Sequence, residues 1–160
     1  GGLADQAART PWTADSLIVV FSATKGLTAM ALNLAAERGM FDWNTPVAQY
    51  WPAFGQAGKQ HITVRQLFNH RAGLGGITTP LTLAQLCDPA QADSVRAALE
   101  RQAPAWPADT QQGYHGISYG LYATAFFEQV CGEPLHTFLH REYLDPLGAD
   151  VFMGLSLIHI

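Results

Sequence analysis

Residues 16–26 read SLIVVFSATKG, and this stretch decides the fold. Its first part, residues 16–21, is largely apolar and β-branched, which makes it the best strand candidate in the chain. A helical pattern follows over residues 22–38, with apolar positions at i, i+3, i+4 and i+7, and Gly39 stands where a helix usually ends. The sequence therefore predicts a junction between a strand and a helix at Ser22.

Ser22 and Lys25 are spaced so that they lie on one face of the predicted helix. A serine hydroxyl is a poor nucleophile until a neighbour takes its proton, and a lysine that burial keeps neutral can accept it. Free N–H groups in the first turn of the helix can also stabilise a developing oxyanion. Ser-x-x-Lys occurs by chance on the order of once in a few hundred residues. An N-cap serine followed by a solvated lysine therefore remains the alternative.

A second candidate element is Tyr114-His115-Gly116, which follows the polar stretch 109–113. A tyrosine held near a lysine can share its proton and act as general base for Ser22. The alternative is a half-buried tyrosine whose hydroxyl contacts water.

The remainder of the chain reads as mostly helical. Loops are expected at 40–54 and 74–82, and further helices are predicted at 64–69 with Thr63 as N-cap, from Asp88-Pro89 onward, at 118–130 with Gly132 as terminator, and at 134–144. A single strand needs partners for its backbone groups. Nothing later in the sequence reads as a comparable strand, so we expect a truncated chain.

Composition excludes several classes of function. Apolar residues make up 48% of the chain and charged residues 14%, which is typical of a globular protein. The net charge of −4 and the scattered lysines and arginines argue against nucleic acid as a partner. No apolar run approaches the roughly 20 residues of a membrane span. Because the chain begins at Gly1, its compartment stays open. The sequence gives no indication of the oligomeric state.

Taken together, longer stretches of the chain resemble a known family. They are residues 17–26 (LIVVFSATKG), 62–74 (ITVRQLFNHRAGL), 110–120 (TQQGYHGISYG) and 143–154 (YLDPLGADVFMG). The chain is similar to the serine β-lactamase-related family of class C β-lactamases, DD-peptidases and family VIII carboxylesterases. The resemblance implies an α/β fold of the β-lactamase/transpeptidase type, with Ser22 as acyl-forming nucleophile, Lys25 as its activating partner and Tyr114 as base. It implies no metal and no organic cofactor.

Two departures from the family pattern carry information. Gly116 stands where the β-lactamases and peptidases usually have the Asn of Tyr-x-Asn, which holds a substrate amide. This departure favours the esterase branch and a small-molecule ester over an amide substrate, with His115 and Gly116 contacting it. The third family motif, a Gly-rich or Lys-Thr-Gly-like strand, is missing, and losing one oxyanion donor typically costs about 10²–10³ in rate.

The missing motif also sets the expected domain boundaries. We expect residues 1–154 to be a partial domain, the helical lobe, and to be nearly inactive alone. The last residues, 155–160 (LSLIHI), resemble a non-native tail.

Other motifs offer rival interpretations. Residues 116–120 match Gly-x-Ser-x-Gly, but the polar residues before Ser118 do not form the strand that a nucleophile elbow requires, so Ser118 is predicted to be an N-cap. His136 and His140 have a metal-binding spacing without a third ligand, which favours exposed helix positions. His70 is interpreted as ordering a loop near the site. A non-catalytic binding protein with the same fold remains a further alternative.

Overall fold

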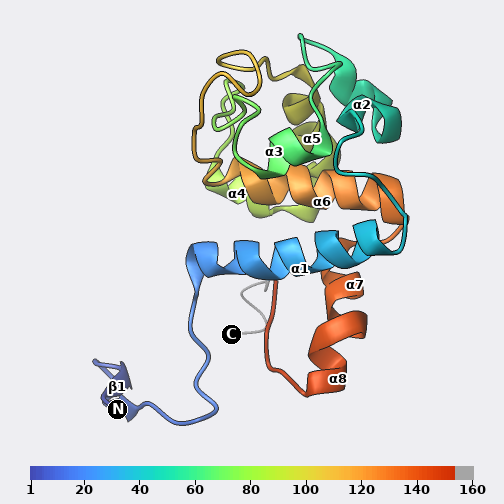
Figure 1. The fold of residues 1–160 in the computed structure, drawn as a ribbon. Helices are drawn as coiled ribbons and strands as arrows, with labels where there is room; N and C mark the ends of the chain where they lie inside the picture. The colour runs from blue at the N-terminus through green and yellow to red at the C-terminus, as the bar shows by residue number, and fades with distance from the viewer. Residues whose placement is uncertain (154–160) are drawn as a thin grey trace.

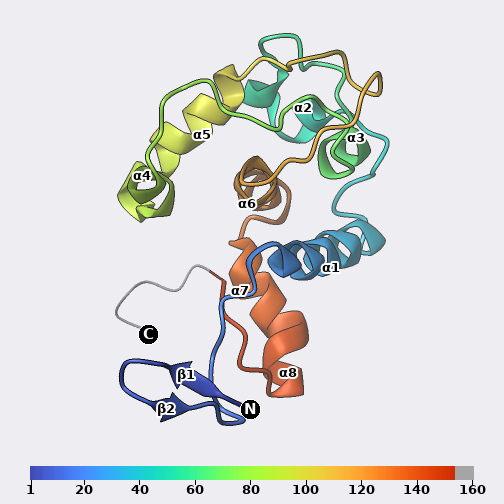
Figure 2. The same ribbon diagram turned by 90° about the vertical axis from the view of Figure 1, so that its left-hand side faces the viewer.

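The computed structural model describes residues 1–153, and its architecture is mainly helical (Figure 1). The helices are α1 (Thr24–Glu37), α2 (Val47–Tyr50), α3 (Val64–Phe68), α4 (Leu83–Cys87), α5 (Ala92–Arg101), α6 (Ser118–Cys131), α7 (Leu135–Leu139) and α8 (Asp145–Leu147). Strands β1 (Leu3–Asp5) and β2 (Thr10–Pro11) form a small antiparallel hairpin of exposed residues. Both views draw this hairpin apart from the helical layers (Figure 2).

Helix α1 lies in the middle of the helical layers. It packs against both α6 and α7, and Figure 1 draws it between them. The buried residues of α1 include Ala31 and Ala35, and small side chains let neighbouring helices approach closely. Two neighbouring helices therefore hold α1, which begins at Thr24 just after the turn that contains Ser22.

The end of α1 is set by Gly39, as the sequence predicts. Gly39 adopts a φ of 74°, and its N–H donates to Ala36 O at 2.9 Å. The N–H of Met40 donates to Ala35 O at 3.0 Å. A left-handed residue followed by such backward bonds is a usual helix terminator, and glycine adopts this conformation without Cβ strain.

An aromatic cluster links α6 to the segments before α3. Phe126 of α6 is fully buried, and its ring centroid lies 5.1 Å from Phe41, 5.7 Å from Phe68 and 6.0 Å from Tyr50. Aromatic residues of the 40–54 segment therefore pack against α6. That segment also contains α2 and the short 3₁₀ turn η2 (Pro52–Gly55), where only a loop was expected.

Helix α3 begins as predicted. Thr63 accepts a hydrogen bond from Gln66 N at 3.2 Å, and the Gln66 side chain accepts one from Thr63 N at 2.8 Å, which is a complete capping box.

A buried lysine binds the C-terminal end of α5. Lys59 is fully buried, and its Nζ donates to the carbonyl oxygens of Glu100 and Gln102, each at 2.6 Å.

The predicted strand at 16–21 is wrong. Residues 16–20 have no regular secondary structure, and Leu17, Ile18 and Val19 are between 55% and 70% exposed. Residue 21 opens the 3₁₀ turn η1 (Phe21–Ala23). A strand needs a neighbour for its backbone donors and acceptors, and within residues 1–153 the only sheet is the two-stranded β1–β2 hairpin, which residues 16–20 do not join. An apolar, β-branched composition is therefore not enough to form a strand here, because no partner strand is present in the described residues.

Other boundaries differ in detail. Helix α4 lies where no helix was expected, and the Asp88-Pro89 helix start is a 3₁₀ turn, η3 (Pro89–Gln91), that leads into α5. Between α7 and α8 the chain forms a π-helical turn, η4 (His140–Leu144). The predicted helices at 118–130 and 134–144 are otherwise confirmed. The tail at 155–160 lies outside the described residues.

Candidate active site

Ser22 lies in η1, directly before α1, and its side chain is exposed. The preceding residue, Phe21, has a φ of 44°, a left-handed conformation that is strained for a bulky side chain. The N–H of Ala23 donates to Val20 O at 3.1 Å and closes the turn. This sharp turn presents Ser22 at the N-terminal end of α1.

Lys25 is in the first turn of α1 and is partly buried. Its Nζ donates to Ser22 Oγ at 3.3 Å and to the backbone oxygen of Gly116 at 2.7 Å. The helical spacing explains the first contact, since residues three apart are neighbours on a helix surface. The second contact joins α1 to the segment before α6.

Tyr114 comes from that same segment and reaches Ser22. Its hydroxyl donates to Ser22 Oγ at 2.7 Å, and Lys25 Nζ lies 5.0 Å from the centroid of its ring. The hydrogen bonds with Ser22 and then Lys25, together with the Lys25 charge, hold the pKa of Tyr114 below its ordinary value of 10.0. The hydroxyl, the amine and the phenol that the sequence singled out therefore meet at one point.

His115 and Gly116, the two residues predicted to contact a substrate, have different environments. His115 is fully buried, and its Nε2 accepts a hydrogen bond from Leu74 N at 3.3 Å. Burial, followed by the nearby His70, lowers the pKa of His115 to about 4, so the imidazole is neutral near pH 7. The buried side chain therefore joins the segment before α6 to the backbone of Leu74. Gly116 lies in the site, where its carbonyl receives the Lys25 ammonium.

The rival nucleophile has a different environment. Ser118 is the first residue of α6, not its N-cap, which is Ile117. The Ser118 side chain is 1% exposed, and its Oγ donates to Leu74 O at 2.8 Å. Residues 109–117 form no strand in the described structure. The context that a nucleophile elbow requires is therefore missing around Ser118.

No group of three or more His, Cys, Asp or Glu side chains within residues 1–153 could hold a metal ion, and His136 is exposed on α7. Within the same residues, none of the helices combines the length and the apolar character that crossing a membrane requires.

Sequence reasoning missed Tyr119 as a neighbour of the site. Its ring, in the first turn of α6, lies with its centroid 5.5 Å from Lys25 Nζ. Together with Tyr114 it surrounds the ammonium with aromatic rings, an arrangement that stabilises a cation. No spacing rule links a residue of α6 to one of α1. The only local signal was an aromatic residue close to Tyr114.

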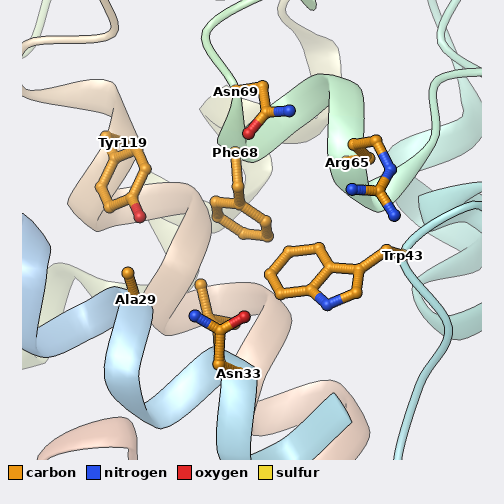
Figure 3. A pocket seen from close by; sticks show the side chains of 8 residues that line it. Ala29, Asn33, Trp43, Arg65, Phe68, Asn69 and Tyr119 are labelled. Carbon is orange, nitrogen blue, oxygen red and sulfur yellow. The ribbon is translucent and has the colours of Figure 1, made fainter. Parts of the chain in front are cut away.

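A small hollow lies beyond Tyr119, between α1, α3 and α6 (Figure 3). Its volume is about 200 Å³, and Figure 3 draws the Tyr119 hydroxyl pointing toward Ala29 at its edge. Ser22, Lys25 and Tyr114 are absent from its lining. Ligand pockets usually enclose roughly 300–1,000 Å³, so the hollow is small for a substrate site.

Comparison with known proteins gives the class. The family model named Beta-lactamase matches residues 1–153. The chain therefore belongs to the β-lactamase family, and its fold is the β-lactamase/transpeptidase fold.

Individual relatives narrow this placement. The chain is 38% identical over 151 residues to the Esterase/beta-lactamase LipL of Mycobacterium tuberculosis, a match that covers 93% of this chain and 34% of LipL. It superposes on a penicillin-binding protein homologue from Caulobacter crescentus with a TM-score of 0.90 and 35% identity, covering 99% of this chain and 42% of that one. A family VIII carboxylesterase gives a TM-score of 0.85 and 35% identity, covering 92% and 40%.

These relatives, whose names include esterase, β-lactamase and carboxylesterase, put the chain in the serine hydrolase superfamily. The chain spans about a third of LipL and about two fifths of the two solved structures.

Proposed function

We propose that the whole protein is a serine hydrolase that forms an acyl-enzyme on Ser22 and acts on small ester substrates. The observation that carries this proposal is the short contact between Tyr114 Oη and Ser22 Oγ, 2.7 Å, beside the Lys25 ammonium. A nucleophile, a proton acceptor and a cation that stabilises the acceptor's charged form are the parts that activated serine chemistry requires.

The arrangement favours Tyr114 over Lys25 as the proton acceptor. Lys25 already donates to Gly116 O at 2.7 Å, which suits an ammonium, and its charge stabilises a phenolate at Tyr114. In the proposed first step, Tyr114 is in its phenolate form, and Ser22 Oγ attacks the ester carbonyl while its proton moves to Tyr114 Oη. The proton then passes to the leaving alcohol oxygen as the carbon–oxygen bond breaks. In the second step, water attacks the acyl carbon and gives a proton to Tyr114 Oη. The bond between this carbon and Ser22 Oγ then breaks, Tyr114 returns the proton to Ser22 Oγ, and the carboxylic acid leaves.

The tetrahedral intermediate needs hydrogen-bond donors for its oxyanion. We assign one donor to the Ser22 N–H, because the first N–H groups of a helical segment lack partners within it and point outward. A second donor would come from a part of the whole protein outside this chain, which spans only 34–42% of the relatives cited above.

The preference for esters rests on Gly116. This residue has no side chain that could hold a substrate amide, and the family VIII carboxylesterase and LipL, whose name includes both esterase and beta-lactamase, are among the relatives. Hydrolysis of β-lactams or peptidoglycan amides is the second candidate, which the LipL name and the penicillin-binding protein homologue favour.

A fluorophosphonate probe tests the nucleophile directly. We expect the whole protein to be labelled, Ser22→Ala to abolish labelling, and Ser118→Ala, the matched control, to keep it. Circular dichroism should verify that both variants are folded, because Ser118 is buried and hydrogen-bonded. Labelling that survives Ser22→Ala but disappears in Ser118→Ala would support the elbow interpretation. No labelling of the wild-type protein would support a non-catalytic binding protein.

Substrate preference is tested by comparing turnover of a short-chain p-nitrophenyl ester with that of a chromogenic cephalosporin. We expect the ester to be hydrolysed faster. Gly116→Asn is an informative variant, since a Cβ at this position would lie 3.6 Å from Tyr114 Cε1, which is an ordinary contact. The variant should shift the ratio toward the cephalosporin. A wild-type protein that prefers the cephalosporin would overturn the ester assignment.

A further inference from the structure

His70 accepts two hydrogen bonds, one from the residue before Tyr114 and one from the residue after it. The backbone oxygen of His70 accepts from Gly113 N at 3.0 Å, and the ring Nδ1 of His70 accepts from His115 N at 3.0 Å. Gly113 and His115 are the two chain neighbours of Tyr114. His70 therefore holds the backbone on both sides of the residue whose hydroxyl contacts Ser22.

The His70 ring also contacts the aromatic side chains around Lys25. Its centroid lies 5.1 Å from that of Tyr114 and 5.4 Å from that of Tyr119. His70 adopts a φ of 61°, which turns the chain just after α3 and aims its ring at this cluster. Non-glycine residues rarely adopt this conformation, and strain of this kind often accompanies functional sites.

From this geometry we infer that His70 is a positioning residue, whose Nδ1 acts as an acceptor that fixes Tyr114 against Ser22. The inference rests on the proposed function for its kinetic consequence, but not for its structural one. To accept from His115 N–H, the Nδ1 atom must carry no proton, which puts the ring proton on Nε2. A protonated imidazole has donors on both nitrogens and cannot make this bond.

The surroundings of His70 favour the neutral ring. The ionisable groups that face it are Lys25 from α1, Tyr114 and His115 from the loop, and Tyr119 from α6. Burial, and then the charge of Lys25, hold the pKa of His70 below its ordinary value of 6.5. The acceptor is therefore available at neutral pH and is lost as the pH falls through that lowered pKa.

Two uncharged substitutions separate the acceptor from the ring. In His70→Asn the amide oxygen stands at the position of Nδ1, and asparagine tolerates a positive φ. In His70→Gln the oxygen lies one bond further out. The readout is amide hydrogen exchange of His115 in the 160-residue chain, with Gly113 as internal control, because its bond goes to the backbone oxygen of residue 70.

We expect wild type and His70→Asn to protect the His115 amide, and His70→Gln to lose roughly two- to tenfold of that protection while Gly113 stays protected. Only wild type should lose the protection on acidification. Equal protection of His115 in wild type and His70→Gln would overturn the inference. Loss at both amides in His70→Gln would also overturn it, since residue 70 would then support the fold in general.

Labelling of Ser22 by fluorophosphonate in the whole protein adds the kinetic consequence. In wild type, protonation of His70 should lower the rate further than the titration of Tyr114 alone does. This additional loss at low pH should be absent in His70→Asn, and the rate should fall at all pH values in His70→Gln. If His115 protection follows the predicted pattern but the wild-type protein is never labelled, the proposed function fails and the positioning role stands. If Ser22 is labelled equally in wild type and both variants at every pH, the kinetic part of the inference is wrong.

Discussion

At the scale of single residues, two tyrosines lie at nearly the same distance from Lys25, but only one contacts the serine. The rings of Tyr114 and Tyr119 have their centroids 5.0 Å and 5.5 Å from Nζ, whereas the hydroxyl that donates to Ser22 Oγ is that of Tyr114. Tyr119 is 5% exposed and Tyr114 is 60% exposed. Proximity to the cation is thus shared between the rings, while the proposed proton transfer belongs to one.

This difference gives a matched pair of variants. Tyr114→Phe should lower the rate of fluorophosphonate labelling by about 10²–10⁴-fold, because it removes the general base but keeps the ring over Lys25. Tyr119→Phe also keeps a ring beside Lys25 and should label at close to the wild-type rate. The wild-type labelling rate should rise with pH, because the phenolate is the base. The rise should occur at a lower pH than for a free tyrosine, since the pKa of Tyr114 is lowered. Similar losses in both variants would argue against Tyr114 as base.

At the scale of secondary structure, α6 carries glycines with opposite roles. Gly120 lies in its first turn, where a Cβ would meet nothing within 4 Å beyond the helix's own backbone. Gly132 caps its C-terminal end with a φ of 69°, and its N–H donates to Glu128 O at 3.0 Å. An alanine suits the first environment and is strained in the second.

The same substitution should therefore have opposite effects at the two ends of α6. Gly120→Ala should raise the free energy of unfolding by roughly 0.5–1 kcal/mol, since glycine loses more backbone entropy than alanine on entering a helix. Gly132→Ala should lower it by about 1–2 kcal/mol through strain at positive φ. Urea unfolding followed by circular dichroism measures both. Destabilisation by Gly120→Ala would show that close packing, rather than helix propensity, decides this position.

At the scale of the whole molecule, an ion-pair network ties the end of α1 to the C-terminal helices. Arg38, the C-cap of α1, donates to both carboxylate oxygens of Glu142 at 2.8 and 2.5 Å, and Arg141 adds a bond to Glu142 at 3.0 Å. Bidentate pairs of this kind are stronger than most surface ion pairs. Arg38 first, and then Arg141, lower the pKa of Glu142 from 4.5 to about 2.

This network predicts an acid-dependent stability. Because the folded pKa of Glu142 lies below its unfolded value, its contribution is present above about pH 4.5 and is lost as the pH falls toward about 2. Glu142→Gln should flatten the dependence of the free energy of unfolding on pH in this window. Arg38→Met keeps an alkyl chain near Phe138 and should do the same, and the double variant should add little further. A Glu142→Gln profile as steep as wild type would exclude this pair as the cause.

Local features of the sequence determined the helix ends and the buried faces. Gly39, Gly132 and Thr63 are where the structure ends or begins helices, because φ preference and capping act within a few residues. The spacing of Ser22 and Lys25 was likewise enough to predict that the hydroxyl and the amine lie close together, although Ser22 belongs to the 3₁₀ turn before α1.

Tertiary structure alone decided the features that depend on distant partners. Residues 16–20 are not a strand, because strand pairing depends on a neighbour and not on composition. The contact of Tyr114 with Ser22 spans 92 residues of sequence. The sequence suggested that His70 lies near the site, but its contacts on both sides of Tyr114, and the place of Tyr119 beside Lys25, depend on tertiary packing. The family resemblance singled out Tyr114, but its place beside Ser22 depends on the packing of α1 against α6, which no short-range rule describes.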